Sequence, residues 1–366
     1  MDISLLKAIG ENVVDPRRQY GYLLHKIEDI IVIGLLTVLC KGQDFDDMEL
    51  FGRERIEWLK KFLALPYGIP DSDTFRRVYE RLNPDTLQDC LNHWLASERE
   101  LQAGDIVNID GKTIRGSGSD DHKAYHVVSA WAAENRITLG QTKISKKSNE
   151  ITAIPELLDM LDVEGCIVTI DAMGCQKSII EKITDKGADY VIALKGNQKS
   201  LHEEAKLFFE DFADCVQQHE THDKGHGREE IREYFLESNI GWLPKWSEWS
   251  NLQAIGMVRS TVFVKDAERT ETRYYAASVT DVEQFAKAVR KHWSIENHLH
   301  WSLDVLFDED SAKAKKGNSP LNMNILRKTA LAILDSVKLH RTSKPKKMFK
   351  AALDTSFLER LVFRGK

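Results

Sequence analysis

The sequence has few cysteines and no long apolar run, and these absences narrow the classes of protein that it can encode. Five cysteines stand among 366 residues, at positions 40, 90, 166, 175 and 215, and no two of them form a Cys-x-x-Cys pair. This odd, scattered set argues against a disulfide framework and favours a reducing compartment. The longest apolar stretch, residues 30–39, is about half of the ~20 residues that a bilayer span needs. We therefore expect a buried helix there.

The beginning of the sequence also lacks the features of an export signal. Residues 1–12 read MDISLLKAIGEN, without the basic start and the small-residue cleavage site of a signal peptide. The composition, 42% apolar and 30% charged, is ordinary for a folded protein, and the length suffices for two domains or one elaborated domain. We therefore expect a cytoplasmic protein that makes no contact with a membrane.

Acidic residues outnumber basic residues overall, but basic residues are concentrated in one segment. The net charge is −6, whereas residues 311–350 contain eleven Lys or Arg residues and one acid, Asp335. That segment carries +10 and leaves −16 for the rest of the chain. A basic segment on an acidic body is a candidate contact for nucleic acid. The alternative is a solvated helix followed by a frayed tail.

Helical patterns dominate the first hundred residues. Residues 71–95 read as two helices, the first beginning at Asp71 or Ser72 and the second at Pro84, with Asn83 as its N-cap. Two short helices with a tight joint fit a helix-turn-helix that reads DNA, and they equally fit ordinary helical packing. We expect residues 1–100 to form a helical domain and a candidate DNA-binding domain.

The pattern changes to alternating strands and helices after residue 104. The stretch "DIVNID" predicts a strand that ends on Asp110, and residues 124–145 predict two strands joined at Glu134-Asn135-Arg136. A helix that stops at Gly165, the strand "CIVTIDAMG", a second helix and the strand "YVIALKGN" follow. This βββαβαβ order predicts an α/β core with a mixed sheet flanked by helices, built from residues 101–200 and 278–340.

Residues 201–277 interrupt the core pattern. They contain an acidic helix and the strand-like pieces "REEIREYFLE", "LQAIGMVRSTVFV" and "TRYYAASV", which predict a β-rich insertion. The core resumes with a long helix over residues 281–307, and we expect residues 341–366 to form a basic C-terminal tail.

Carboxylates stand at the ends of two predicted strands. Asp110 and Asp171 each close an apolar run and are each followed by a glycine within a few residues. If the two strands are neighbours, both side chains project at one edge of the sheet, where α/β proteins commonly bind ligands. Two such anions repel each other unless a cation lies between them, and all-oxygen ligation favours Mg²⁺ or Mn²⁺. The alternative is that each Asp only caps the next turn.

A third acid, Glu296, lies on the long predicted helix. At 100° per residue, Val289, His292, Leu299, His300 and Leu303 share its face, so Glu296 is expected to face the sheet. Burying an ionised carboxylate there costs free energy unless it pairs with a cation or binds a metal. The alternative is a buried ion pair with Arg290 or Lys112.

Five motifs, in order, carry a resemblance to a known family. They are "NIDGKTIRGS", "VTIDAMGCQ", "YVIALKGNQ", "HGR" and "HWSIENHLHWSLDVLFDED". In these motifs the chain resembles the H-repeat-associated (ISAs-type) transposases of bacterial insertion sequences, which are DDE enzymes with an RNase H-like core, over about residues 20–335. The broader class carries a Tyr, an Arg and a Lys around its glutamate, where this chain has Val289, His292 and Leu303. The roles of those three residues are therefore not carried over.

The resemblance implies an activity, a cofactor and a partner. Asp110, Asp171 and Glu296 would be the catalytic acids and would hold two Mg²⁺ or Mn²⁺ ions. The reaction would be cleavage of DNA phosphodiesters at the ends of the element, followed by strand transfer. The partners would be double-stranded DNA, at terminal inverted repeats and target sites, and a second copy of the chain in a homodimer on that DNA. The protein would then be associated with the nucleoid.

Several polar residues near these motifs are candidate DNA contacts. Taken singly, each lysine, arginine or asparagine of this kind is more often an ordinary surface residue. Packing within the helix explains the histidines equally well. Trp293 and Trp301 could stack on an unpaired base, although core packing is the ordinary interpretation. The candidate contacts are Lys112, Arg115, Lys195, Asn197, Arg228, His292, Asn297 and His300.

Three other interpretations were weighed. A catalytically inactive transposase relic would keep the fold and act only as a DNA-binding protein. A metal-free hydrolase with two carboxylates, such as a glycosidase, is disfavoured by the basic segment and by the lack of an aromatic sugar platform. A zinc site is disfavoured because its candidate ligands include one thiol and no Cys-x-x-Cys clip; those ligands are Cys215, His219, His222 and His226.

Overall fold

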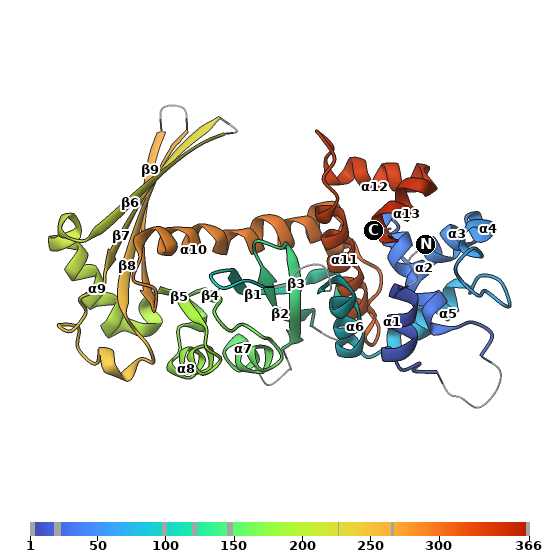
Figure 1. Ribbon diagram of the computed structural model, residues 1–366, viewed down its shortest axis with the longest axis horizontal. Helices are drawn as coiled ribbons and strands as arrows, with labels where there is room; N and C mark the ends of the chain where they lie inside the picture. The colour runs from blue at the N-terminus through green and yellow to red at the C-terminus, as the bar shows by residue number, and fades with distance from the viewer. Residues whose placement is uncertain are drawn as a thin grey trace.

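The computed structural model describes residues 4–17, 23–96, 101–118, 123–144, 149–225, 227–264 and 267–363. Helices form the N-terminal part, as predicted, and Figure 1 shows them at one end of the molecule, beyond the sheet. Asp71 caps α5 by accepting from the Thr74 N–H at 2.7 Å, and Asn83 accepts from the Asp85 N–H at 2.8 Å ahead of α6. The six helices are α1 Ser4–Asn12, α2 Ile27–Leu39, α3 Phe45–Glu54, α4 Ile56–Leu59, α5 Ser72–Arg81 and α6 Pro84–Ala96.

The core has the predicted βββαβαβ order. β1 pairs antiparallel with β2 on one side and parallel with β4 on the other, and β4 pairs parallel with β5. The apolar run 30–39 lies in α2, which is almost entirely buried. The core elements are β1 Ile106–Ile114, β2 Tyr125–Ala132, β3 Ile137–Lys143, α7 Glu150–Asp159, β4 Ile167–Ile170, α8 Lys177–Asp185 and β5 Asp189–Leu194.

Two predicted boundaries were wrong. β1 does not end at Asp110 but continues to Ile114, because β2 pairs with it as far as Tyr125. The helix expected to stop at Gly165 ends at Asp159, because Val163 is buried and Gly165 makes the turn into β4 with a φ of 71°. Such a left-handed conformation suits glycine.

The strands of residues 201–277 extend the core sheet. β9 Ala267–Ala277 pairs antiparallel with β5, and β8 Ala254–Val264, β7 Arg228–Glu237 and β6 Gln217–Gly225 follow outward. The result is one nine-stranded mixed sheet of order β3-β2-β1-β4-β5-β9-β8-β7-β6. α9 Lys199–Phe212 precedes these strands. β6 was not predicted, because its residues QQHETHDKG are polar and face solvent.

Helices cover both faces of the sheet. α7, α8 and α9 pack on one face, and α10 Val282–Ser294 runs across the other. α10 continues as two π-helical segments, Ile295–His300 and Ser302–Leu306. α11 Ser319–Ser336 is almost wholly buried between the sheet and the N-terminal helices.

The C-terminal segment 341–366 is not the tail that the sequence suggested. Within its described part, α12 Lys344–Leu353 and α13 Thr355–Val362 pack Met348, Phe357 and Leu361 into the core. Lys347 donates to the carbonyl oxygens of Leu334 and Val337, at 2.7 and 2.6 Å. A cation at the end of a helix is favourable there, so this lysine fastens α12 to α11. Across the ranges given above, no helix has both the length and the apolar character needed to cross a membrane.

Candidate active site

Asp110 and Asp171 stand at adjacent positions of two neighbouring strands, which is the condition on which the expected edge site depends. β1 and β4 are parallel neighbours, and Ile109 of β1 is paired with Ile170 of β4. The residue that follows each of these two isoleucines is an aspartate. Adjacent strands are about 4.8 Å apart. Asn108 of β1 donates to the Lys291 carbonyl of α10 at 2.8 Å, and Asp110 shares its face of the sheet because side chains alternate along a strand. The Asp110 carboxylate therefore lies under the helix that carries Glu296, where His300 of that helix is 3.5 Å away.

Glu296 is not placed as its helical periodicity predicted. Its side chain is exposed rather than packed on the sheet, because the chain leaves α-helical geometry at Ile295. A π-helical turn contains an extra residue, which rotates each later side chain away from its α-helical position. Neither alternative partner is available, since Arg290 pairs with Asp223 at 3.4 Å and Lys112 with Asp304 at 2.6 Å.

The three acids nevertheless share one electrostatic environment. Burial raises the pKa of Asp110 to about 7, and the negative charges of Glu296, Asp171 and Glu150 add to the increase. Burial and Glu150 also raise the pKa of Asp171, which Lys195 partly offsets. Desolvation is the largest cause of both increases, and the neighbouring negative charges, which a bound cation would offset, add to it.

Asp171 also fulfils the alternative role of a turn cap. Its Oδ1 accepts from the N–H groups of Met173 and Gly174, at 3.0 and 3.4 Å. Asn197 donates to the Ala172 carbonyl at 2.6 Å, which ties the end of β5 to the same turn, and Lys195 is exposed beside it. These contacts fix the position of Asp171 through one oxygen of its carboxylate.

A fourth acid, Glu150, was missed by the sequence analysis. It is the first residue of α7, and its Oε1 lies 2.6 Å from the Nε2 of His126. No local pattern singles it out, because acids are common in the first turn of any helix. Its relation to Asp110 appears only when β1, β2 and α7 are assembled.

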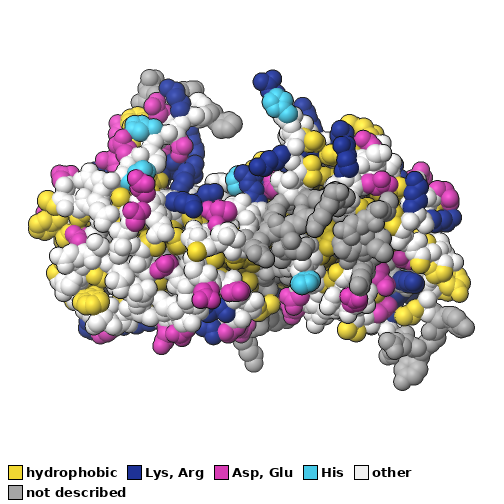
Figure 2. Space-filling view, in the orientation of Figure 1, with side chains coloured by type: hydrophobic (Ala, Val, Ile, Leu, Met, Phe, Trp, Pro, Cys, Tyr) yellow, Lys and Arg dark blue, Asp and Glu magenta, His cyan; other side chains and the backbone are white. Residues whose placement is uncertain are grey.

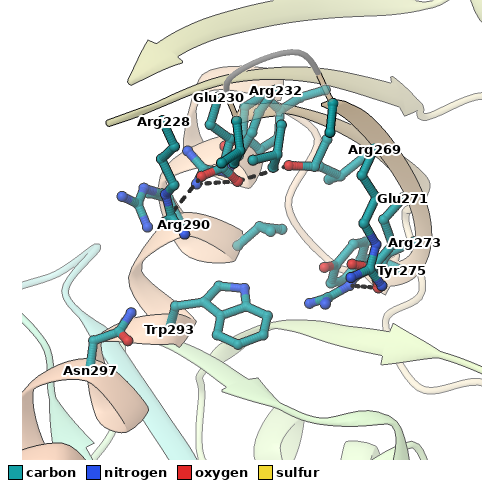
Figure 3. Close-up of a pocket in the computed structure, with 17 residues that line it drawn as sticks. Arg228, Glu230, Arg232, Arg269, Glu271, Arg273, Tyr275, Arg290, Trp293 and Asn297 are labelled. Carbon is teal, nitrogen blue, oxygen red and sulfur yellow. Dashed lines mark hydrogen bonds and ion pairs between the residues drawn. The ribbon is translucent and has the colours of Figure 1, made fainter. Parts of the chain in front are cut away.

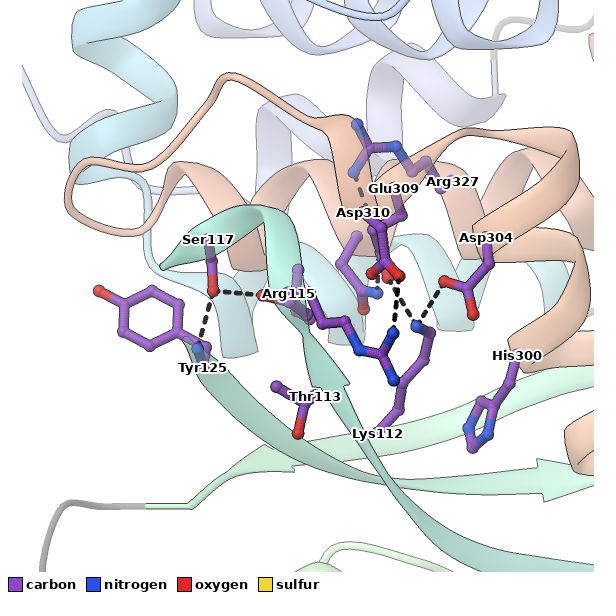
Figure 4. Close-up of polar contacts among 12 residues, drawn as sticks. Lys112, Thr113, Arg115, Ser117, Tyr125, His300, Asp304, Glu309, Asp310 and Arg327 are labelled. Atoms are coloured by element: carbon purple, nitrogen blue, oxygen red, sulfur yellow. Dashed lines mark hydrogen bonds and ion pairs between the residues drawn. The ribbon is translucent and has the colours of Figure 1, made fainter. Parts of the chain in front are cut away.

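Lys112 is buried in an ion-pair network rather than facing solvent. Its Nζ lies 2.6 Å from Asp304 and 3.8 Å from Glu309, and Glu309 also pairs with Arg327 at 3.4 Å (Figure 4). Glu309 is wholly buried, so these cations offset the cost of its charge. The network ties β1 to the π-helical segments and to α11. Arg115, by contrast, is exposed and lies 3.7 Å from Asp310.

The two candidate histidines differ in position. The Nδ1 of His300 lies 3.5 Å from Oδ2 of Asp110, and burial, with Lys328 and Lys112 nearby, lowers the pKa of His300 to about 3. His292 lies between α10 and β4, where its Nδ1 is 2.9 Å from the Thr169 hydroxyl, and burial lowers its pKa to about 4. His292 thus has the packing role named as the alternative, while His300 adjoins the acids.

A groove rich in arginine lies beside the acids (Figure 3). Five arginines of β7, β9 and α10, with Trp293 and Asn297, line its ~540 Å³ of space. We call this the arginine groove. The Arg273 guanidinium lies 4.7 Å above the Trp293 ring, and Asn297 follows Glu296 directly, so the groove opens next to the acids. Of its arginines, the sequence analysis selected only Arg228; the others are Arg232, Arg269, Arg273 and Arg290.

The basic segment 311–350 is less available to a ligand than its charge suggested. Arg327, Lys328 and Lys347 are buried, and Lys328 donates to Ser129 at 2.8 Å. Exposed lysines and arginines remain at its ends, and Figure 2 shows such side chains along a hollow between the outer ends of β6–β9 and the segment joining α11 to α12. Trp301 is 57% exposed, so core packing does not explain it.

The acids fit a hard divalent cation in their chemistry, although they do not yet enclose one. Among the described residues, no three His, Cys, Asp or Glu side chains are close enough together to hold a metal ion. This also leaves the described members of the zinc candidate, Cys215, His219 and His222, without a site, while His226 lies outside the described residues. Carboxylate oxygens with excess negative charge are the donors that Mg²⁺ and Mn²⁺ prefer.

Comparison with known proteins agrees with this arrangement. Residues 102–333 match the family described as the transposase DDE domain, and residues 11–95 match its associated domain. The chain is 39% identical to "Putative transposase YncI" of Escherichia coli O157:H7, over 98% of this chain and 94% of that protein. It is 37% identical to "H repeat-associated putative transposase YhhI" of Escherichia coli (strain K12), over 96% of this chain and 97% of that protein.

The matches cover both the N-terminal helices and the core that carries the acids. A shorter relative, "Inactive transposase YbfQ" of Escherichia coli (strain K12), is 33% identical over 17% of this chain and 73% of its own length. The family match spans the mixed sheet and α10, and one relative that covers 96% of this chain carries the H repeat-associated name. The chain therefore belongs to the DDE transposase family, together with the H repeat-associated transposases.

Proposed function

We propose that the chain is an active transposase that uses divalent metal ions to cut DNA phosphodiesters at the ends of an insertion sequence and to transfer the freed strands. The observation that carries this proposal is the half-buried Asp110, whose pKa is raised to about 7 by desolvation and, in part, by Asp171 and Glu296. Acids from β1, the end of β4 and the π-helical segment thus act on one another, although they are far apart in the sequence.

Asp110, Asp171 and Glu296 would hold two Mg²⁺ or Mn²⁺ ions. Bound there, such ions stabilise negative charge on the attacking and leaving oxygens of an in-line displacement. Asp171 is oriented by its turn and Asp110 by its strand, so Glu296 is the group that must move. Neutral His300, next to Asp110, leaves the negative charge of that carboxylate available.

Double-stranded DNA at the terminal repeats and at the target would be the substrate. The exposed Lys195, Arg115 and Arg228 and the arginine groove lie around the acids and would contact phosphates. The buried Lys112 and the half-buried His292 would act only by supporting the site. We further propose that two copies of the chain pair on the DNA and that the protein works at the nucleoid.

A nicking assay tests the proposal. Glu296→Gln should abolish Mg²⁺-dependent nicking of duplexes that carry the ends of the element, while Glu283→Gln, a matched exposed acid on the same helix, should nick like wild type. The inactive-relic interpretation predicts DNA binding without nicking in the wild-type protein. Equal nicking by Glu296→Gln and wild type would contradict the assignment of the third acid.

A further inference from the structure

We propose that a row of exposed cations leads from the acid site to α5 and holds the DNA duplex on one side of the cut. The inference rests on the proposed function, because it names the path of the DNA that the acids would cleave. The row is built from three segments that are far apart in the sequence, and we call it the basic track. Its members, in spatial order, are Arg115, Lys313, Lys315, Lys316, Arg81 and Arg77.

The track begins where β1 leaves the acid site. Arg115 directly follows β1, is 79% exposed and lies 3.7 Å from Asp310 (Figure 4). Gly116 packs against the same segment, because a Cβ on it would lie 2.5 Å from the carbonyl oxygen of Glu309. Residues 115 and 116 are thus fixed against the beginning of the segment that carries the lysines.

The segment between Asp310 and α11 continues the track. Ala314 packs against the hydrophobic core, whereas the lysines on either side of it, Lys313 and Lys315, are exposed. Lys313 lies 3.3 Å from Asp44, which precedes α3, so the segment runs over the N-terminal helices. The inward alanine anchors the segment, and the outward lysines face solvent.

The same segment is joined to the C-terminal end of α5. The N–H of Asn318 donates to the Glu80 carbonyl at 2.9 Å, and Lys316 lies 3.5 Å from the Glu80 carboxylate. Gly317 has a left-handed φ of 57°, and a Cβ on it would overlap the carbonyl oxygen of Glu80. These contacts hold Lys316 beside Arg81, the last residue of α5.

Half of these cations have no acid to neutralise them. Among the described residues, Lys315, Arg77 and Arg81 have no carboxylate within ion-pairing distance, and Arg77 donates to the backbone carbonyl of Asp73 at 3.2 Å. Arg77 and Arg81 stand four residues apart on α5 and share a face, where two like charges repel each other. An uncompensated row of cations is the electrostatic footprint of a polyanionic ligand. The phosphate backbone of duplex DNA, the substrate of the proposed function, fits this charge.

The length of the track limits how far it can follow the DNA. The strand from Asp110 to Arg115 covers about 17 Å, and the chain from Asp310 to Lys316 spans at most about 20 Å. The turn from Arg77 to Arg81 adds about 6 Å. Phosphates follow one another every ~3.4 Å along a strand, so the track reaches at most about 13 base pairs from the cut.

Fluorescence anisotropy tests the inference with the full-length protein and a duplex that carries the end of the element. The triple variant Arg77→Ala/Arg81→Ala/Lys315→Ala should reduce the slope of log affinity against log salt concentration by about two to three. Each lost phosphate contact removes about 0.9 from that slope. All three side chains are exposed, so the fold should be unaffected.

A matched control removes the same charge elsewhere. Lys60→Ala/Lys61→Ala/Lys206→Ala takes three exposed cations from the end of α4 and from α9, and it should keep the wild-type slope. Shortening the duplex on one side of the cut should erase the difference between the two triple variants. Shortening it on the other side should preserve that difference.

The outcomes separate this inference from the proposed function. Equal salt slopes for the two triple variants would overturn the basic track, while Mg²⁺-dependent nicking that is lost in Glu296→Gln would still support the function. A wild-type protein that neither binds nor nicks the ends of the element would overturn both. Should the first triple variant not fold, Lys315→Glu, which lies outside every helix and strand, replaces it. An unchanged slope in Lys315→Glu would equally refute the track.

Discussion

Oδ2 of Asp110 lies 3.5 Å from Nδ1 of His300, and this contact joins β1 to the π-helical segment that carries Glu296. Both side chains are largely buried, and burial raises the pKa of the acid and lowers that of the histidine. Each group is thereby pushed toward its neutral form. A site arranged in this way is destabilised by its own ionisation, and several predictions about stability and binding depend on that property.

Asp110 should make the protein less stable as the pH rises. Its pKa is 3.8 unperturbed and about 7 in the folded chain, so between these values the folded state binds more protons than the unfolded state. The free energy of unfolding should therefore fall from about pH 4 to about pH 7. Asp110→Asn should remove this dependence and raise the stability at pH 8 by about 1–3 kcal/mol. Urea unfolding at several pH values, without divalent ions, measures both; a less stable Asp110→Asn at pH 8 would contradict the account.

Divalent ions should stabilise the wild-type protein most where Asp110 is ionised. Because a proton and a cation compete for the same carboxylate, the rise in Tm caused by Mn²⁺ should be larger at pH 8 than at pH 6. In Asp110→Asn the rise should be small at both pH values. A scanning fluorimetry series with Mn²⁺ tests this, and an equal rise in wild type and Asp110→Asn would count against cation binding at the acids.

The buried Glu309 should be costly to neutralise. It lies 3.4 Å from Arg327 and 3.8 Å from Lys112. Lys112 would keep Asp304 at 2.6 Å, but Glu309→Gln would leave the buried Arg327 without its paired carboxylate. We expect a loss of about 3–5 kcal/mol in the free energy of unfolding. Asp310→Asn, whose partner Arg115 is exposed, should cost less than about 1 kcal/mol. Chemical denaturation of the two variants compares them directly, and equal losses would refute the role of the buried network.

The arginine groove should contribute to DNA affinity through phosphate contacts. Arg269 is exposed within it, so Arg269→Ala should weaken binding to any duplex and reduce the dependence of affinity on salt concentration. Lys206→Ala removes an exposed charge from α9, on the other face of the sheet, and should leave both quantities unchanged. Fluorescence anisotropy at several salt concentrations measures them. Indistinguishable salt slopes for the two variants would remove the groove from the DNA path.

Local patterns in the sequence foresaw much of the core. The apolar runs before Asp110 and Asp171 predicted two strands, and the structure confirms both. It also shows that they are parallel neighbours, which was the condition for a site at one edge of the sheet. The beginnings of two helices were also predicted, from the capping residues Asp71 and Asn83. A helix cap can be predicted in this way because it bonds to residues two or three positions along the chain.

The features that were missed depend on contacts between distant segments. Glu296 was placed by an α-helical period that ends at Ile295, where the chain becomes π-helical. Lys112 looked like a surface cation because its partners, Asp304 and Glu309, lie nearly 200 residues away. Glu150 had no local signal, since only the assembled sheet brings it to Gly111. β6 has polar residues throughout and forms because β7 offers it an edge.

Anomalous diffraction from Mn²⁺ in crystals of the protein with a duplex of its element's end tests the central claim most directly. The account predicts Mn²⁺ peaks within bonding distance of Asp110 and Asp171, with the Glu296 side chain turned inward to complete the ligand set. Peaks elsewhere on the protein, or peaks at the aspartates with Glu296 still directed to solvent in the DNA complex, would contradict it.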